Sequence, residues 1–121
     1  LDLEALDQGI LAAAEARGLG IIARGCFGGG LLKDSLDEAA LKAATPKWRR
    51  ILALRSLSQS LGRPLIDSAL QFCRATPAVS VTLLGMHTEK HLQDNQRYFR
   101  SPNLTSHEYT ELLRHVRELN E

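Results

Sequence analysis

The sequence has 121 residues, the size of one modest domain. Hydrophobic residues make up 44% and charged residues 24%, as in soluble globular proteins, and a net charge of +1 gives no general attraction to nucleic acid or membrane surfaces. No apolar run reaches about 18 residues, so we expect no transmembrane helix. Two widely separated cysteines favour reduced thiols and a cytoplasmic location over a disulfide framework.

The amino-terminal segment predicts a helix followed by a strand. Apolar side chains recur at spacings of three and four from Leu3 to Ala14, so residues 3–17 are expected to form an amphipathic helix. Gly18 stands where glycine commonly ends a helix. The run "LGIIA" at residues 19–23 is short and continuously apolar, which is typical of a buried parallel strand.

The middle of the chain predicts a glycine-rich loop and three helices. The loop "RGCFGGGLLKD" follows the strand, and "SLDE" has the form of a capping box that begins a short helix over residues 35–43. In "TPKW", Thr45 is expected to cap a helix that continues to residue 61. Pro64 is expected to begin the next helix, which ends near residue 75.

The last third of the chain predicts a second strand and two helices. The run "VSVTLLG" at residues 79–85 is rich in β-forming side chains and bounded by turn residues, which indicates a second buried strand. Thr88 is expected to cap a helix that extends to about residue 98. The segment "TSHE" is a second capping box, so a final helix is expected from Thr105 to residue 119.

This order of elements predicts an α/β fold with two parallel strands, because strands separated by helices are most simply parallel. Two strands leave both sheet edges unpaired and cannot close on themselves. The chain is therefore expected to be a slice of a larger β/α fold. The acidic start "LDLEALDQG" lacks the charge order of a signal peptide, and the absence of an initial Met suggests that the sequence begins inside a longer chain.

Two loops follow the carboxyl ends of the strands, where β/α folds place their ligands. The loop "RGCFGGG" at residues 24–30 has four glycines, which let backbone approach a ligand closely. A plain flexible connection is the alternative for this stretch. The segment "GMHTEKH" at residues 85–91 joins a strand end to a helix start, whose free N–H groups and dipole favour an anion. His87, Lys90 and His91 add basic side chains there, and an ordinary capped helix is the alternative.

Two other patterns carry less weight. The run "GLGIIA" at residues 18–23 has the letters of a dinucleotide fingerprint, but it precedes a strand instead of following one. His87 and His91 have the spacing of a zinc pair, but Thr88 stands where a catalytic glutamate would be and no third ligand is evident. We therefore predict no metal site, and no residue of this chain is predicted to be catalytic.

The ordered set of motifs resembles the carboxy-terminal half of an aldo-keto reductase. A family segment similar to "AYSPLGGGLL" reads "ARGCFGGGLL" at residues 23–32. A later family segment similar to "IPGARSPEQLEEN" reads "LLGMHTEKHLQDN" at residues 83–95. Between them, "SLGRPLIDSALQF" at residues 60–72 is similar to a family helix. The likeness covers nearly the whole chain.

The resemblance implies a (β/α)8 TIM barrel that binds NADP(H) and moves hydride between nicotinamide and a carbonyl group. Residues 1–121 would be a single partial domain, helix-rich, comprising the last two β/α units and incomplete as a stand-alone barrel. The first loop would lie along the nicotinamide and pyrophosphate, the second would surround the adenosine phosphate, and Asp94 and Asn95 would face the adenine. The implied cofactor-binding residues are Arg24, Gly25, Cys26, Phe27, Gly28, Gly85, Met86, His87, Thr88, His91, Asp94 and Asn95.

Departures from the family's pattern bear on the cofactor. Arg24 stands where the family often has an aromatic residue that stacks on nicotinamide, and Gly25 stands where serine is common. His91, with His87 nearby, stands at the basic position that often contacts the 2′-phosphate. Neutral histidine holds a dianion less firmly than arginine does. NADP is the implied cofactor, with NAD as the alternative.

The family's catalytic Asp, Tyr, Lys and His belong to the first half of the barrel, so this chain alone is expected to be inactive. In the complete protein its partners would be a dinucleotide and a small carbonyl substrate, with no nucleic acid and no membrane. Alone, the chain is expected to self-associate to cover its sheet edges. Two alternatives to a reductase are a noncatalytic nucleotide-binding module and a helical protein-interaction domain whose two strands are buried loops.

Overall fold

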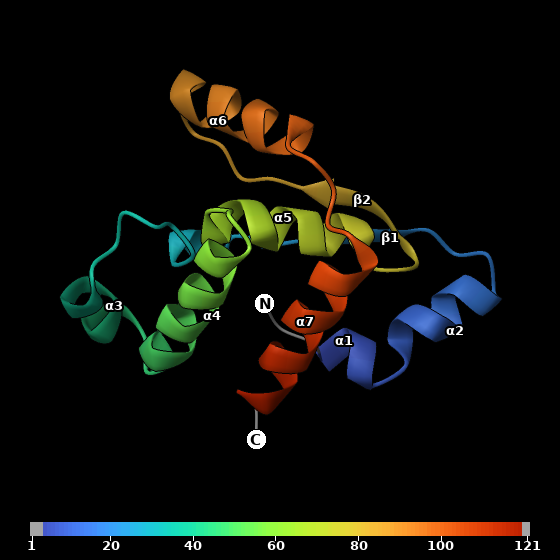
Figure 1. Ribbon diagram of the computed structural model, residues 1–121. Coiled ribbons are helices and arrows are strands. Elements are labelled where there is room, and N and C mark those ends of the chain that lie inside the picture. The colour runs from blue at the N-terminus through green and yellow to red at the C-terminus, as the bar shows by residue number, and fades with distance from the viewer. Residues whose placement is uncertain (1–3, 120–121) are drawn as a thin grey trace.

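The computed structural model describes residues 4–119 and has the expected α/β order (Figure 1). Two strands pair in parallel, and the other elements are helices. The elements are α1 (Glu4–Asp7), α2 (Ile10–Ala16), β1 (Ile21–Arg24), the 3-10 helix η1 (Gly28–Gly30), α3 (Glu38–Ala44), α4 (Trp48–Ser60), α5 (Leu65–Ala75), β2 (Val79–Leu83), α6 (Glu89–Arg100) and α7 (Ser106–Glu118).

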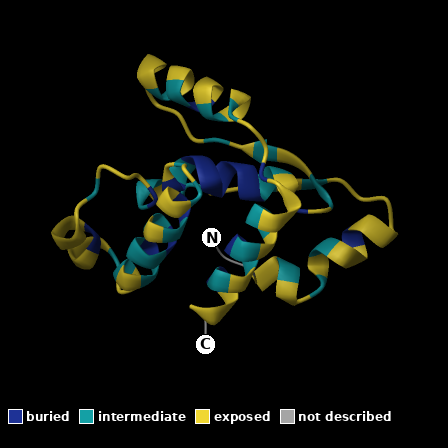
Figure 2. Ribbon diagram, in the orientation of Figure 1, coloured by how far each residue is buried: buried dark blue, intermediate teal, exposed yellow. Residues whose placement is uncertain are grey.

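Helix α5 lies at the centre of the molecule. It contacts β2, α4, α6 and α7, and Figure 1 shows α6 on one side of it with α4 and α7 on the other. Figure 2 shows α5 buried along most of its length, whereas the surrounding helices expose at least one face. Because neighbours surround it, polar side chains are buried there too and are hydrogen-bonded within the protein. Asp67, for example, accepts from Arg63 at 3.2 Å and from the Ser101 hydroxyl at 2.9 Å.

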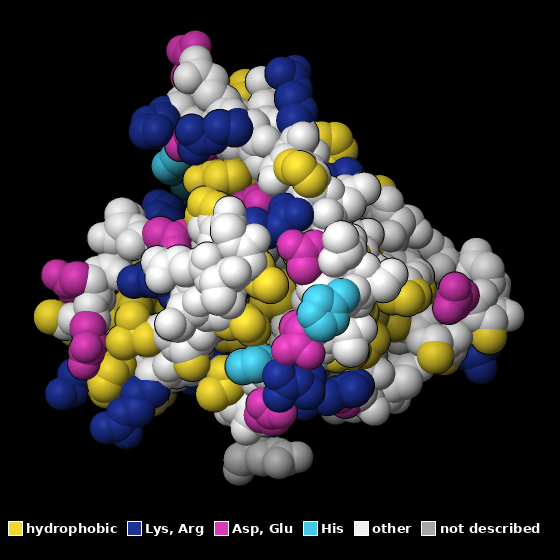
Figure 3. Space-filling view, in the orientation of Figure 1, with side chains coloured by type: hydrophobic (Ala, Val, Ile, Leu, Met, Phe, Trp, Pro, Cys, Tyr) yellow, Lys and Arg dark blue, Asp and Glu magenta, His cyan; other side chains and the backbone are white. Residues whose placement is uncertain are grey.

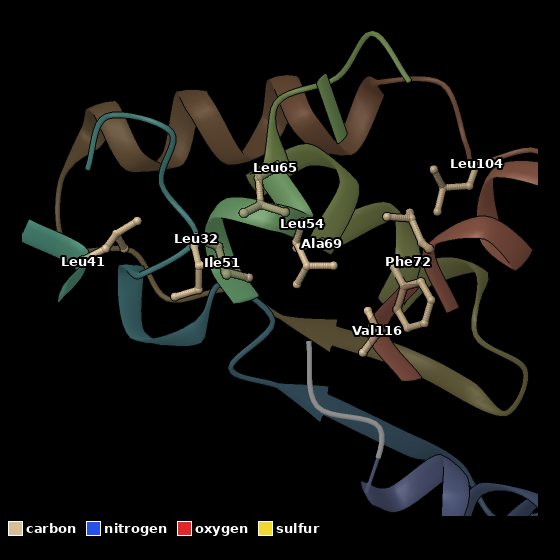
Figure 4. Packing of buried hydrophobic residues seen from close by; sticks show 10 residues of the cluster. Leu32, Leu41, Ile51, Leu54, Leu65, Ala69, Phe72, Leu104 and Val116 are labelled. Carbon is tan, nitrogen blue, oxygen red and sulfur yellow. The ribbon is translucent and has the colours of Figure 1, made fainter. Parts of the chain in front are cut away.

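The hydrophobic core fills the space between α5 and the helices around it. Figure 4 shows Leu54 of α4 and Ala69 of α5 facing each other in this core. The ring of Phe72 stacks on Tyr109 of α7 with 4.8 Å between ring centroids. Stacked aromatic pairs add about 0.5–1.5 kcal/mol to the free energy of burial. The buried members of the core are Leu32, Leu41, Ile51, Leu54, Leu65, Ala69, Phe72, Leu104, Leu112 and Val116.

The two-stranded sheet confirms the predicted parallel pairing and corrects the predicted burial. Arg24 lies opposite Leu83, and an irregularity in β2 precedes Val81, the partner of Ile22. The expectation of two buried strands is wrong, since the side chains of Ile22, Val81 and Leu83 are 63%, 47% and 55% exposed. Helix α5 packs against β2, so one face of the sheet is covered while these three side chains remain open to solvent.

Glycines shape the amino-terminal segment. Gly9 has a φ of 74° and divides the predicted helix into α1 and α2, since a left-handed residue interrupts helical hydrogen bonding. The predicted start at Leu3 lies outside the described residues. Gly18, with a φ of 64°, ends α2 as expected, and the Leu19 N–H donates to the Ala14 carbonyl at 2.9 Å.

The capping predictions divide into confirmed and corrected ones. Thr105 and Glu108 form the predicted capping box, with hydrogen bonds of 3.2 and 2.7 Å. Thr88 caps α6 as expected. The predicted cap of α3 is wrong, because Asp37 and not Ser35 accepts the Ala40 N–H, at 2.7 Å.

Helix α4 begins later than predicted. Thr45 accepts the N–H of Lys47 at 3.2 Å, and the helix proper starts only at Trp48. The hydroxyl of Thr45 therefore supports a turn that precedes the helix instead of capping the helix itself.

Candidate functional site

The two predicted ligand loops leave the sheet at the same edge. Parallel strands place their carboxyl ends together, and the pairing of Arg24 with Leu83 aligns the ends of β1 and β2. The loop after β1 carries residues 25–28, and the loop after β2 carries residues 85–88 and leads into α6. Parallel pairing thus brings two segments that are distant in sequence to one end of the sheet.

The first loop depends on glycine geometry. Gly25 and Gly28 have φ values of 71° and 58°, which side chains other than glycine seldom adopt. The Gly28 N–H donates to the Gly25 carbonyl at 2.9 Å and closes a tight turn directly after Arg24. Both glycines are exposed, so their backbone is accessible to a ligand. Phe27, between them, is half-buried, and its carbonyl accepts from Gly30 at 3.0 Å.

A cavity of about 460 Å³ opens beside β1. It is mostly apolar and is bordered by α1, α2, α4 and α5, with Arg24, Lys47 and Arg50 as its basic residues. Arg24, Gly25, Cys26 and Gly28 are among its lining residues, whereas residues 85–95 are not. The predicted site residues of the first loop, except Phe27, therefore border this cavity, and those of the second loop and α6 lie outside it.

The second loop ends at the amino terminus of α6. Gly85, Met86, His87 and Thr88 are all exposed. The Thr88 hydroxyl accepts the His91 N–H at 3.1 Å, which leaves the first two N–H groups of the helix, at residues 89 and 90, without a partner inside the helix. These N–H groups and the helix dipole favour an anion.

The two histidines of this loop are linked. Nδ1 of His91 accepts the backbone N–H of His87 at 3.3 Å, and the two ring centroids lie 6.3 Å apart. A ring that accepts at Nδ1 carries its proton at Nε2 when it is neutral. His91 can therefore donate from Nε2 to a ligand without losing its contact with the loop.

The two residues expected to face an adenine have different surroundings. Asn95 is buried, and its amide donates to the Gly85 carbonyl at 3.5 Å. Asp94 accepts from Lys90 at 2.9 Å and from Arg97 at 3.2 Å, and the hydrogen bond from Lys90 lowers the pKa of Asp94. Asp94 is thus ionised at neutral pH and already has two cationic partners. Figure 3 shows the Lys and Arg side chains gathered over α6 at the top of the view.

Sequence reasoning did not predict that both cysteines border the cavity beside β1. Cys26 in the first loop is buried, Cys73 on α5 is half-buried, and both thiols are free. Nothing in the sequence relates Cys73 to the loop after β1, because its position on the cavity depends on how α5 packs.

Within residues 4–119 no three His, Cys, Asp or Glu side chains gather as a metal site. In the same part of the chain, no helix is both long and apolar enough to cross a membrane.

Comparison with known proteins identifies one family. The model of the aldo/keto reductase family matches residues 3–117, a span that contains both strands and both loops. A comparison with curated proteins finds no match. The motif resemblance drawn from the sequence is therefore confirmed over nearly the whole chain.

Proposed function

The chain belongs to the aldo/keto reductase family, and from this premise we propose that it supplies the nucleotide-binding part of an NADPH-dependent oxidoreductase. Membership of the family indicates an oxidoreductase. The finer proposal is that the complete protein reduces aldehydes or ketones, or oxidises the corresponding alcohols. One observation carries it: two exposed loops, one rich in glycine and one leading into a helix amino terminus, meet at the carboxyl edge of two parallel strands.

The second loop fits the phosphate of the adenosine half. Free N–H groups at residues 89 and 90 and the dipole of α6 lie at one helix start, and His91 lies in the same first turn with Nε2 free to donate. Asn95 holds the Gly85 carbonyl, so the loop is tied to the helix that it precedes. These groups suit a phosphate monoester, and the proposed cofactor is therefore NADP, with NAD as the alternative.

The first loop fits the nicotinamide half. Gly25 and Gly28 offer backbone without side-chain obstruction, and Arg24 adds a positive charge at the end of β1. Bound NADPH would supply the hydride that reduces a carbonyl carbon. The proposed role of this loop is to position the nicotinamide, while the proton donor comes from the first half of the barrel.

The exposed face of the sheet supports a larger barrel. Ile22, Val81 and Leu83 are apolar, exposed and adjacent on the paired strands. Apolar side chains in such an arrangement are usually covered in a stable protein. We propose that in the complete protein they face the interior of a (β/α)8 barrel whose other strands pair with β1 and β2.

Nucleotide titration of the complete protein tests this function. NADPH should bind, and His91→Ala should weaken binding about tenfold, since a hydrogen bond to a charged group contributes about 1.5 kcal/mol or more. Binding of NADH, which lacks the 2′-phosphate, should change little in the same variant. His107→Ala on α7 is the control, because His107 is an exposed histidine in the first turn of another helix. Absence of NADPH binding would refute the proposal, and binding without carbonyl reduction would favour a noncatalytic nucleotide-binding module.

A further inference from the structure

The carboxyl end of α6 is attached to α5 by two side chains, Gln71 and Arg74, which we call the α6 anchor. Nε2 of Gln71 donates to the Tyr98 carbonyl at 2.8 Å, and Nη1 of Arg74 donates to the Phe99 carbonyl at 2.9 Å. These carbonyls lie in the last turn of α6, where helical hydrogen bonding ends and the helix dipole is negative. The guanidinium of Arg74 also lies over the Phe99 ring, with Cζ 4.3 Å from the ring centroid. The α6 anchor therefore combines hydrogen bonds, a charge suited to the helix dipole and a cation–π contact.

The α6 anchor is part of a polar row along α5. Asp67, Gln71 and Arg74 lie four and three residues apart, so they share one face of this helix. The side-chain oxygen of Gln71 accepts from Arg74 at 3.0 Å, and Asp67 accepts from the Ser101 hydroxyl at 2.9 Å, directly after α6. Gln71 is 1% exposed, so water does not compete for its hydrogen bonds. This face of α5 therefore holds the end of α6 at several points.

The amino-terminal half of α6 has no comparable attachment. Within residues 4–119, the side-chain hydrogen bonds of residues 87–97 all stay within α6 and the loop before it. Asn95 is the only buried residue of α6, and no side chain of this helix belongs to the hydrophobic core. Figure 2 shows α6 as an outer helix that is exposed along most of its length. Little apolar burial fixes the direction of α6, so the attachment at its carboxyl end has the larger effect.

We propose that Gln71 and Arg74 are positioning residues for the nucleotide: they fix the direction of α6 and thereby set the position of its first turn. This inference rests on the proposed function, because it assumes that the first turn of α6 binds the 2′-phosphate of NADPH. Neither side chain contacts the nucleotide in this arrangement. Their effect passes through α6, which acts as a rigid helix.

The length of α6 makes its anchor effective. Its 12 residues span about 18 Å, so a rotation of about 5° at the carboxyl end moves the first turn by about 1.5 Å. Hydrogen bonds from N–H groups to oxygen vary only from about 2.7 to about 3.2 Å in length. A displacement of this size would therefore break the bonds that residues 89 and 90 are proposed to make. A small change at the α6 anchor is enough to weaken phosphate binding while the helix itself stays intact.

Nucleotide titration of the complete protein tests the positioning role. Arg74→Ala removes the donor to the Phe99 carbonyl and the contact with its ring, so we expect the Kd for NADPH to rise about fivefold, within the ordinary range of coupling between distant groups. The Kd for NADH, which lacks the 2′-phosphate, should change little. A loss of overall stability would not discriminate between the two nucleotides, so the ratio of their affinities reports the position of α6. Equal changes for both nucleotides, or no change for NADPH, would overturn the positioning role.

Two further variants serve as controls for Arg74→Ala. Arg74→Lys keeps the charge and a donor at the helix end, and it should restore most of the NADPH affinity. A lysine variant that binds as weakly as the alanine variant would overturn the assignment to a charged donor. Arg49→Ala removes a matched contact elsewhere, because the Arg49 guanidinium lies over the Trp48 ring of α4 at 4.8 Å. It should leave the Kd for NADPH unchanged, and an equal loss in this variant would also overturn the proposal.

Hydrogen–deuterium exchange tests the α6 anchor without a nucleotide. Gln71→Met keeps a side chain of similar length and removes the donor to Tyr98, and Arg74→Ala keeps the test open if the buried Gln71→Met variant does not fold. In both variants we expect the amides of residues 89–100 to exchange about fivefold faster, which matches the loss of one or two hydrogen bonds. Amides of α4 should exchange at the unmodified rate. Unchanged exchange in α6, or equal acceleration in both helices, would overturn the anchor.

The two experiments separate the α6 anchor from the proposed function. If the unmodified protein binds no NADPH, the proposed function and the positioning role both fail, while hydrogen–deuterium exchange still decides whether α5 holds α6. If α6 is released in the variants and the affinity for NADPH stays the same, the anchor exists but does not position the nucleotide site, and the positioning proposal is overturned.

Discussion

The buried side-chain amide of Asn95 donates to the backbone carbonyl of Gly85, so a residue in the middle of α6 holds the loop that precedes the same helix. The bond is long, at 3.5 Å, and its net contribution is modest. Its effect is local, since it acts on one carbonyl at the start of the proposed phosphate loop. Asn95 therefore positions this loop and need not contact a nucleotide itself.

Replacing Asn95 with Ala should affect binding more than folding. The Gly85 carbonyl can turn to water, so we expect the free energy of unfolding to fall by about 1 kcal/mol. The loop loses its anchor, and the Kd for NADPH should rise several-fold. Urea unfolding and nucleotide titration measure the two effects. Gln96→Ala, at the exposed neighbouring position, is the control and should change neither. Unchanged NADPH affinity in Asn95→Ala would remove Asn95 from the site.

Asp67 should be one of the most sensitive polar positions for stability. Its buried carboxylate pairs with Arg63, which also donates to the carbonyls of Pro102 and Asn103. Asp67→Ala leaves a largely buried guanidinium short of one charged partner and should lower the free energy of unfolding by about 3 kcal/mol. Denaturant unfolding measures the loss. Glu118→Ala removes a carboxylate from an exposed ion pair and should change stability by less than about 1 kcal/mol.

The capping box of α7 should make the free energy of unfolding depend on pH. The hydrogen bond from the Thr105 N–H lowers the pKa of Glu108 below its ordinary value of 4.5. A carboxyl group with a lowered pKa in the folded state stabilises the protein above its unfolded pKa, and this contribution disappears as the pH falls through the folded pKa. Glu108→Gln keeps an acceptor but cannot ionise, so its stability should fall less steeply below pH 4.5.

Thermal unfolding of Glu108→Gln and of the unmodified protein, from neutral pH down to about pH 3, measures how much stability each loses in acid. A pH of 3 lies roughly one unit below the ordinary pKa of carboxyl groups. Glu118→Gln is the matched control, because Glu118 lies at the other end of the same helix. If Glu108→Gln and the unmodified protein lose stability in parallel, the capping carboxylate does not contribute to the acid response.

Local signals in the sequence were sufficient for most helix boundaries. The capping box of Thr105 and Glu108 and the helix-ending Gly18 depend on residues within one or two turns, and both were predicted correctly. The predicted cap of α3, Ser35, was wrong because of a contact with a residue distant in sequence. Arg55 donates to the carbonyls of Lys33 and Leu36 at 2.9 and 2.8 Å, which holds the chain around Ser35 outside the helix, and Asp37 caps instead.

The site was predictable only in outline. Alternating helices and apolar runs predicted parallel strands, and parallel strands bring their following loops to one edge. The degree to which the strands are buried was not predictable from their composition, because it depends on which helices or strands pack against each face of the sheet. The separation of the loop residues into a group that lines the cavity and a group outside it, and the position of Cys26 and Cys73 on that same cavity, follow from the packing of α5.

The exposed face of the sheet should make the isolated 121-residue chain self-associate. Ile22, Val81 and Leu83 form an apolar surface between two strands whose outer edges have no partner strand within residues 4–119. Such a surface favours contact with a second copy. Val81→Lys places a charge in its middle and should shift the chain toward monomer in sedimentation velocity. Leu92→Lys alters an exposed leucine of α6 away from the strands and should leave association unchanged. A stable monomer of the unmodified chain would contradict this prediction, as would equal effects of the two variants, because the sheet face would then have no special role in association.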